Sequence, residues 1–186
     1  MAMLNSWWAL VFLAWLVFWG LGAYNRLVRL RSAIGQNLAV IDSHLTRYEE
    51  LVELAVTAAA SAPFGWQSSI APELGAAHWT RLQTAARKTA IAMAHWQDLL
   101  FSRAAARALR ESKLELAQAW QSINHPDVYY ITVAPELQSR WTELDVLIQP
   151  DVDRYNQAVI HYNAAIAQFP ALLLARLFSF HSASPL

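Results

Sequence analysis

The side chains that could perform metal chemistry are scattered along this sequence. Its six histidines stand at positions 44, 78, 95, 125, 161 and 181, and no two of them are three or four residues apart. A zinc-binding helix of the HExxH type needs that spacing, because only such residues share a helix face. The histidines therefore predict no metal site, and we expect no cofactor.

Three acidic pairs could supply general acid–base chemistry: Glu49 with Glu50, Glu111 with Glu115, and Asp151 with Asp153. Only Glu111 and Glu115 share a helix face, and nearby Lys113 favours an ordinary solvated surface there. The sequence has neither a glycine-rich phosphate loop nor a GxSxG motif. Carboxylates from different helices could still assemble one site, but we expect no enzyme and no small-molecule substrate.

Composition excludes further classes. The chain has no cysteine, which excludes disulfides, thiolate zinc sites, iron–sulfur clusters and cysteine nucleophiles. Fourteen basic residues balance fourteen acidic ones, and no basic patch exceeds the three arginines at positions 26, 29 and 31. A nucleic-acid partner is therefore not expected.

The opening of the chain reads as a membrane anchor. Residues 4–23 (LNSWWALVFLAWLVFWGLGA) are almost wholly apolar, and about 20 such residues cross the hydrocarbon core of a bilayer. Trp7 and Trp8 lie near one edge, and Trp19 and Tyr24 near the other, as in an aromatic belt. The alternatives are a buried helix or a cleaved signal peptide, but no Lys or Arg precedes the run. We expect an uncleaved single-pass anchor at residues 1–25.

Charge predicts the orientation of that anchor. Arg26, Arg29 and Arg31 follow it, and the first acidic residue is Asp42. The positive-inside rule then places the N-terminus outside and the C-terminal domain in the cytoplasm. The expected location is the cell (inner) membrane.

The rest of the chain predicts long helices. Apolar residues recur every three or four positions from Leu27 to Ala55, so the anchor should continue into the first bundle helix as one rod that ends near Ser61. Residues 62–75 indicate a loop. A second helical region runs from Ala76 to Ile123, with Leu114 on its apolar face and either continuity or a break within residues 103–113.

Residues 127–133 indicate an extended connection to a third helix that starts at Pro135. Its inward side chains should include Leu137, Trp141, Leu144 and Leu147. Pro150 predicts a kink or a short break before the last long helix, whose positive N-terminal end would suit Asp151 and Asp153. The expected fold is all-α, with the N-terminal transmembrane helix continuing into an antiparallel bundle of long helices. Its parts are the anchor (1–25), the bundle (26–170) and an apolar tail (171–186).

The dipeptide Tyr-Asn occurs twice in the last long helix. Tyr155-Asn156 and Tyr162-Asn163 are seven residues apart, so both pairs project from one side of the helix. They could form a binding surface. Alternatively, the tyrosines belong to the core and the asparagines bond a neighbouring helix.

These motifs carry a family resemblance. YNRLVRLR after the anchor and IDSHLTRYEELVELA at residues 41–55 resemble the opening of LemA-type membrane proteins, and RYNQAVIHYNAAIAQFPALLLARLFSF resembles their C-terminal signature. The chain lacks the family's Trp near Leu38, its second Arg at Tyr48 and its Ile-Pro-Asn run near Val52, so it looks like a divergent member. The resemblance implies motif residues with a structural or interaction role: Tyr24, Asn25, Asp42, Arg47, Tyr155, Asn156, Tyr162, Asn163, Phe169 and Pro170.

The resemblance implies a helix bundle on a single anchor, without an established enzymatic activity. We therefore expect a scaffold or adaptor that contacts the lipid bilayer and either a protein partner or further copies of itself. The alternatives are an accessory subunit of a membrane protease or envelope-stress system, and a membrane-associated enzyme. The apolar tail either caps the bundle core or lies on the membrane or a partner.

Overall fold

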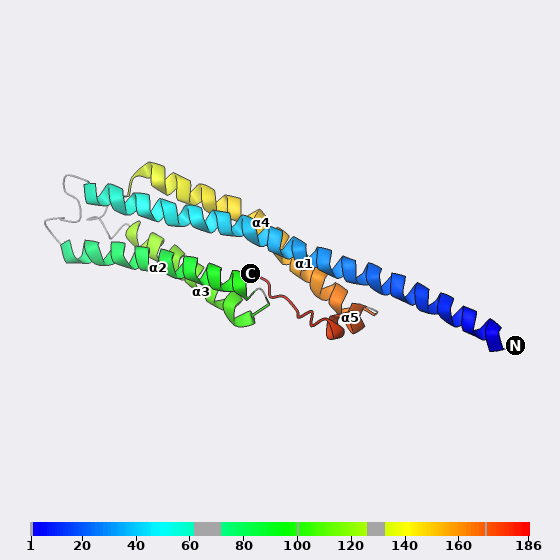
Figure 1. The fold of residues 1–186 in the computed structure, drawn as a ribbon. Helices are drawn as coiled ribbons and strands as arrows, with labels where there is room; N and C mark the ends of the chain where they lie inside the picture. Colours follow the sequence, from blue (N-terminus) through cyan, green and yellow to red (C-terminus); the bar gives the residue numbers. More distant parts are fainter. Residues whose placement is uncertain (1, 62–71, 100, 126–132, 170) are drawn as a thin grey trace.

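The computed structural model describes residues 2–61, 72–99, 101–125, 133–169 and 171–186. These residues form five helices and no strand (Figure 1). The predicted all-α bundle is confirmed. Residues 62–71 of the predicted loop at 62–75, and all of the predicted connection at 127–133 except the buried Val133, lie outside the described residues.

The first helix, α1 (Ala2–Ser61), is one uninterrupted element, with a length of about 90 Å at 1.5 Å per residue. Its first part extends beyond the bundle, and its second part packs in it (Figure 1). From Leu27 onward one side is buried, through Ile34, Leu38 and Ile41 to Val52. The predicted continuous rod is therefore confirmed.

The second and third helices, α2 (Pro72–Asp98) and α3 (Arg103–Ile123), pack against each other. The predicted start of α2 at Ala76 is wrong by a turn, because proline at a first helical position supplies a suitable φ and needs no hydrogen-bonded N–H. Residues 103–113, for which either continuity or a break was expected, are continuous within α3. The chain turns just before these residues, where the Ser102 hydroxyl accepts a bond from the Ala105 N–H and caps α3.

The inward placement of Leu114 is wrong, since this side chain is 59 % exposed. The buried side of α3 instead includes Leu109, Ser112 and Leu116. The Ser112 hydroxyl donates to the Leu109 carbonyl oxygen, which makes a polar residue acceptable at a buried position. A pattern based on apolar residue types alone therefore places Leu114 on the buried side of α3 and misses Ser112, which is buried.

The fourth helix, α4 (Pro135–Ala167), runs alongside α1 and continues through Pro150. The predicted break is wrong, and so is the separate helix start proposed for Asp151 and Asp153. Proline removes the donor that would bond the Val146 carbonyl, but Val146 lies on the solvent side, where water can replace that donor. Trp141 and Leu144 are buried as expected, whereas Leu147 is 43 % exposed.

Aromatic packing and a short fifth helix complete the bundle. Trp120 of α3 stacks on Trp141 of α4 with ring centroids 4.2 Å apart.

Helix α5 (Ala171–Leu177) contacts α1 and α4 and is bent by 93° from α4. A non-helical segment then runs back along the bundle to Leu186 (Figure 1).

Candidate functional site: the Tyr-Asn ladder on α4

The paired Tyr-Asn motifs bind the C-terminal segment. The Asn163 side chain donates to the Ala183 carbonyl oxygen and accepts from the Ala183 N–H, both at 2.9 Å. Asn156 does the same with Leu186, at 3.1 and 2.8 Å. Each carboxamide thus satisfies both polar groups of one backbone residue. We call Tyr155, Asn156, Tyr162 and Asn163 the Tyr-Asn ladder.

The spacing of the ladder matches the spacing of the bound segment. Seven residues of α-helix rise about 10.5 Å, and three residues of extended chain span about 10 Å. Asn156 and Asn163 are seven residues apart, and their targets Leu186 and Ala183 are three apart. A helix with this repeat can therefore hold an extended peptide running antiparallel to it without bending either partner.

The two tyrosines bind the same segment from inside the core. The Tyr155 hydroxyl donates to the Ser184 carbonyl oxygen at 3.1 Å, and the Tyr162 hydroxyl to that of His181 at 3.0 Å. Both residues are 0 % exposed, and Tyr155 packs edge-on against Trp96 with ring centroids 5.2 Å apart. Burial raises the pKa of both phenols, so they remain neutral hydrogen-bond donors.

The structure thus combines parts of both sequence-based interpretations. The two tyrosines belong to the core, as the second interpretation predicted. The asparagines bind the chain's own tail, however, and not a neighbouring helix. All the bonds of the ladder reach tail backbone atoms, which any residue except proline can offer in full. The tail target was missed because spacing along α4 shows which side chains share a face, but not what lies opposite.

The other motif residues lie at different places. Tyr24 packs on Phe178 and Phe180 of the tail, with ring centroids 5.0 and 6.0 Å apart, whereas Asn25 is exposed. Phe169 contacts the Trp19 ring at 5.9 Å. Pro170 lies outside the described residues.

Asp42 and Arg47 do not join the ladder. Asp42 is half-buried on α1, and Arg47 is exposed and lines a shallow groove with Glu50 and Arg140. In the part of the chain that the structure describes, no ion pair involves either residue. The structure therefore brings Tyr155, Asn156, Tyr162 and Asn163 together and leaves these two apart.

A buried polar pair between α1 and α4 was missed by sequence reasoning. His44 Nε2 lies 2.9 Å from Asp151 Oδ2, and the side chains are 10 and 12 % exposed. Arg154 also binds the Asp151 carboxylate. A carboxylate that fixes one ring nitrogen orients the imidazole, but so little exposure gives a substrate poor access. No spacing rule could have joined two residues 107 positions apart.

A second polar contact links the same two helices. The Tyr48 hydroxyl donates to Asp145 Oδ1 at 2.5 Å, and its ring packs edge-on against Trp141. Burial, followed by the bond to the Asp145 carboxylate, raises the pKa of Tyr48. Lys113 on α3 faces Asp145, and burial lowers its pKa although that carboxylate opposes the effect. Tyr48 and Asp145 thus join α1 to α4 through a hydrogen bond.

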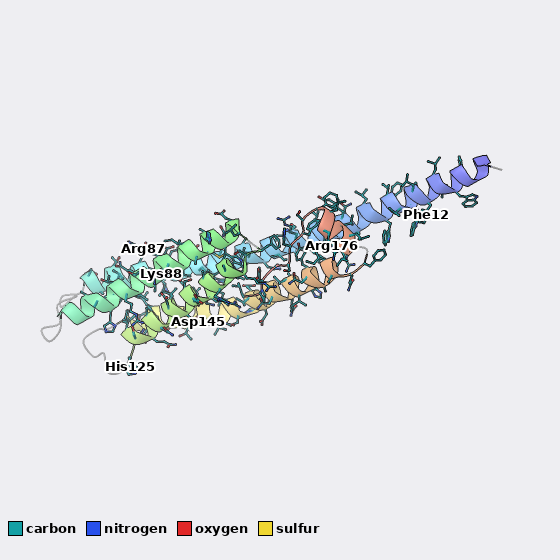
Figure 2. The ribbon with its side chains drawn as sticks, turned by 90° about the horizontal axis from the view of Figure 1, so that it is seen from below. Phe12, Arg87, Lys88, His125, Asp145 and Arg176 are labelled. Carbon is teal, nitrogen blue, oxygen red and sulfur yellow. The ribbon has the colours of Figure 1, made fainter. Side chains whose placement is uncertain are left out.

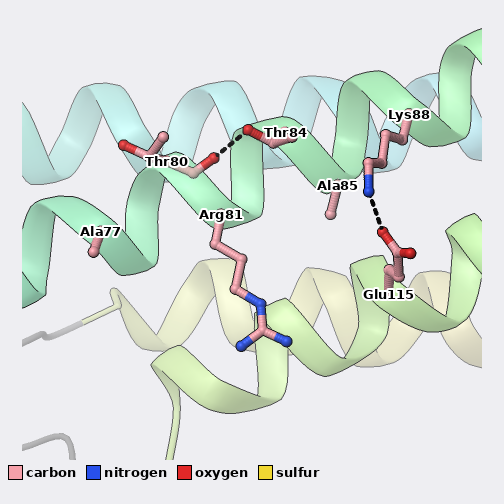
Figure 3. A pocket seen from close by; sticks show the side chains of 7 residues that line it. All are labelled: Ala77, Thr80, Arg81, Thr84, Ala85, Lys88 and Glu115. Atoms are coloured by element: carbon pink, nitrogen blue, oxygen red, sulfur yellow. Dashed lines mark hydrogen bonds and ion pairs between the residues drawn. The ribbon is translucent and has the colours of Figure 1, made fainter.

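The hollow between α2 and α3 is an open, charged surface (Figure 3). Lys88 Nζ and Glu115 Oε2 form an ion pair at 2.8 Å across it, with both side chains more than half exposed. The Thr80 and Thr84 hydroxyls bond backbone carbonyls of their own helix. Arg81 projects across the hollow toward α3 (Figure 3). The prediction that Glu115 lies on a solvated surface is confirmed.

Metal ligands are not clustered in the described segments, where no three His, Asp or Glu side chains could hold an ion. Comparison with known proteins gives a family match. The sequence model described as "LemA family" matches residues 83–186, which is more than half of the chain and includes the whole Tyr-Asn ladder. The resemblance at residues 24–31 and 41–55 lies outside that match. No curated protein and no solved structure matches the chain.

Proposed function

The chain belongs to the LemA family, and from this premise we propose that it is a membrane-anchored, non-catalytic scaffold or adaptor built on one continuous helix. The observation that carries the proposal is the division of α1. Its N-terminal part is long and apolar enough to cross a membrane, and only 6 % of an apolar stretch of 18 residues is buried inside the protein. Trp8, Phe18 and Leu13 are 69, 76 and 57 % exposed. A bilayer would remove these side chains from water.

The orientation rests on charge. Arg26, Arg29 and Arg31 follow the apolar part of α1, and no acidic residue precedes Asp42. In our proposal the N-terminus is outside, and the bundle is held in the cytoplasm next to the inner membrane. The rigid rod then fixes the bundle directly at the membrane surface.

The scaffold role rests on how the polar side chains are used. His44 and Asp151 join α1 to α4, as do Tyr48 and Asp145. The ladder on α4 holds the tail. These groups are engaged in packing contacts that a reaction would have to break. The bundle surface is left to provide contacts with a partner.

Photo-crosslinking in native membranes tests this role. A photoreactive side chain is placed at Ile91 on α2 or Val146 on α4, which are 70 and 67 % exposed. Specific crosslinks to one membrane protein, or between copies, would support the scaffold. A captured catalytic subunit would favour the alternative of an accessory protease or envelope-stress subunit. Turnover by the purified chain that one substitution, such as Asp151→Asn, abolishes without unfolding it would overturn the proposal.

A further inference from the structure

The corner between α4 and α5 exposes a cluster of large apolar side chains. Phe169 and Leu177 are each 75 % exposed, Leu173 is 55 % exposed and Phe178 is 53 % exposed. We call these four residues the corner patch. Grouped exposed side chains of this size mark a surface that contacts something apolar.

The corner patch is continuous with the anchor. The Phe169 ring lies 5.9 Å from that of Trp19, and the Phe178 ring lies 5.0 Å from that of Tyr24. Both partners stand where the apolar part of α1 ends and its arginines begin. The patch is therefore at the depth where the anchor would leave the bilayer.

The direction of α5 suits that place. Helix α4 runs alongside α1, and α5 is bent by 93° from α4. If α1 crosses the bilayer, α5 lies roughly in the membrane plane. Figure 2 shows Arg176 of α5 beside α1, at the end of the bundle from which the segment with Phe12 extends. Short apolar elements lie in this way at the boundary between headgroups and acyl chains.

Charge favours an anionic lipid surface. The chain has no net charge, but residues 1–41 and 154–186 contain no Asp or Glu. They contain five arginines instead: Arg26, Arg29, Arg31, Arg154 and Arg176. On α1 and α5 the charged side chains nearest the anchor are thus arginines alone, whereas Arg154 lies farther along the bundle, where it binds Asp151. Basic residues next to a bilayer are attracted to anionic headgroups.

We propose that the corner patch is a second membrane-contacting surface, inserted at the headgroup boundary of the anionic leaflet from which α1 emerges. This inference rests on the proposed anchoring by α1. The Tyr-Asn ladder contributes by position. It binds residues 181–186 to the bundle, so the chain on both sides of α5 is fixed and the helix cannot swing away from the membrane.

Depth-dependent quenching tests the proposal on the full chain. Because the protein has no cysteine, single substitutions give unique labelling sites. Leu177→Cys probes the patch, Val146→Cys is a similarly exposed control on the distant part of α4, and Leu13→Cys probes the anchor. Each variant carries an environment-sensitive fluorophore and is reconstituted into phosphatidylglycerol vesicles. Quenching is measured with spin-labelled lipid and with aqueous iodide.

We expect the probes at positions 13 and 177 to be quenched by the spin-labelled lipid and protected from iodide. The probe at position 146 should show the opposite. Lipid quenching at position 177 should also weaken in vesicles of zwitterionic phosphatidylcholine, because the arginines then lose their partners.

The two proposals fail in different ways. If position 13 is quenched by lipid and position 177 behaves like 146, membrane contact by the patch is wrong and the anchor stands. If all three positions face water, the anchor is wrong as well. Energy transfer between copies labelled at position 177, without lipid quenching, would show that a second copy covers the patch, and would also overturn the inference.

Discussion

At the scale of single residues, the bound tail explains why an asparagine follows each of the two tyrosines of the Tyr-Asn ladder. Tyrosine fills the core and reaches one carbonyl, while the next residue on the helix points along its flank, where a carboxamide can bind a whole peptide unit. Aspartate could not donate, and glutamine carries the same group on a longer stem. The paired motif therefore has a structural explanation in the tail itself.

Removal of one ladder asparagine should release the tail. Asn163→Ala removes both bonds to Ala183, and we expect a loss of about 1–3 kcal/mol of stability with faster release of C-terminal residues by carboxypeptidase. Gln157→Ala, at an exposed position on the same helix, serves as the control. Equal digestion rates of the two variants would show that the ladder does not hold the tail in solution.

Alkaline pH should destabilise the bundle through its buried tyrosines. The pKa values of Tyr48, Tyr155 and Tyr162 are raised in the fold, whereas a tyrosine in the unfolded chain titrates near pH 10. The unfolded state thus loses its protons first. The stabilisation is complete below pH 10 and declines above it, by up to about 1.4 kcal/mol per pH unit for each tyrosine.

Urea unfolding between pH 8 and pH 11.5 measures this slope. Tyr155→Phe keeps the ring but removes one of the three titrating groups, so the decline in stability above pH 10 should become shallower. An unchanged slope in this variant would mean that Tyr155 is not protected from ionisation in the fold.

At the scale of elements, periodicity predicted the helices well and their ends less well. The stripe from Leu27 to Ala55 gave α1 correctly, because one continuous partner surface covers it. The break predicted at Pro150 is absent, because the solvent side of α4 tolerates a missing hydrogen-bond donor. Leu114 is not on the buried side of α3, where Ser112 occupies a buried position. Such outcomes depend on which elements pack opposite, and residue types do not contain that information.

Continuity of α1 can be tested at Gly35. Nothing lies within 4 Å of a Cβ added there, and glycine inside a helix costs about 0.5–1 kcal/mol relative to alanine. Gly35→Ala should therefore raise the stability by that amount, as measured by thermal unfolding in detergent. A loss of stability would indicate that α1 needs to flex at this point.

Replacing only one member of the His44–Asp151 pair should lower the stability of the bundle. His44→Leu leaves a buried carboxylate with only Arg154, and Asp151→Leu leaves a buried imidazole without its partner. Each should lose about 1–3 kcal/mol. The double variant should lose less than the sum, because no polar group then stays unpaired. Strict additivity in urea unfolding would show that the two side chains are not coupled.

At the scale of the whole molecule, one helix has two parts with different surfaces. The part of α1 before Tyr24 exposes apolar side chains that suit lipid, and from Leu27 onward one side of the helix is buried in the bundle. The sequence predicted this division, because charge and periodicity both change at the same arginines. It could not predict that the tail returns to α4, since that contact requires the folded bundle.

The central claim is that α1 crosses the membrane and enters the cytoplasmic bundle without a break. Single cysteines from position 2 to position 36 are reacted with a membrane-impermeant maleimide in inside-out and right-side-out vesicles. We expect protection through about 20 residues that end near Tyr24, with reaction at Gln36→Cys only in inside-out vesicles. Reaction at Trp15→Cys in intact vesicles, or at Gln36→Cys only in right-side-out vesicles, would contradict it.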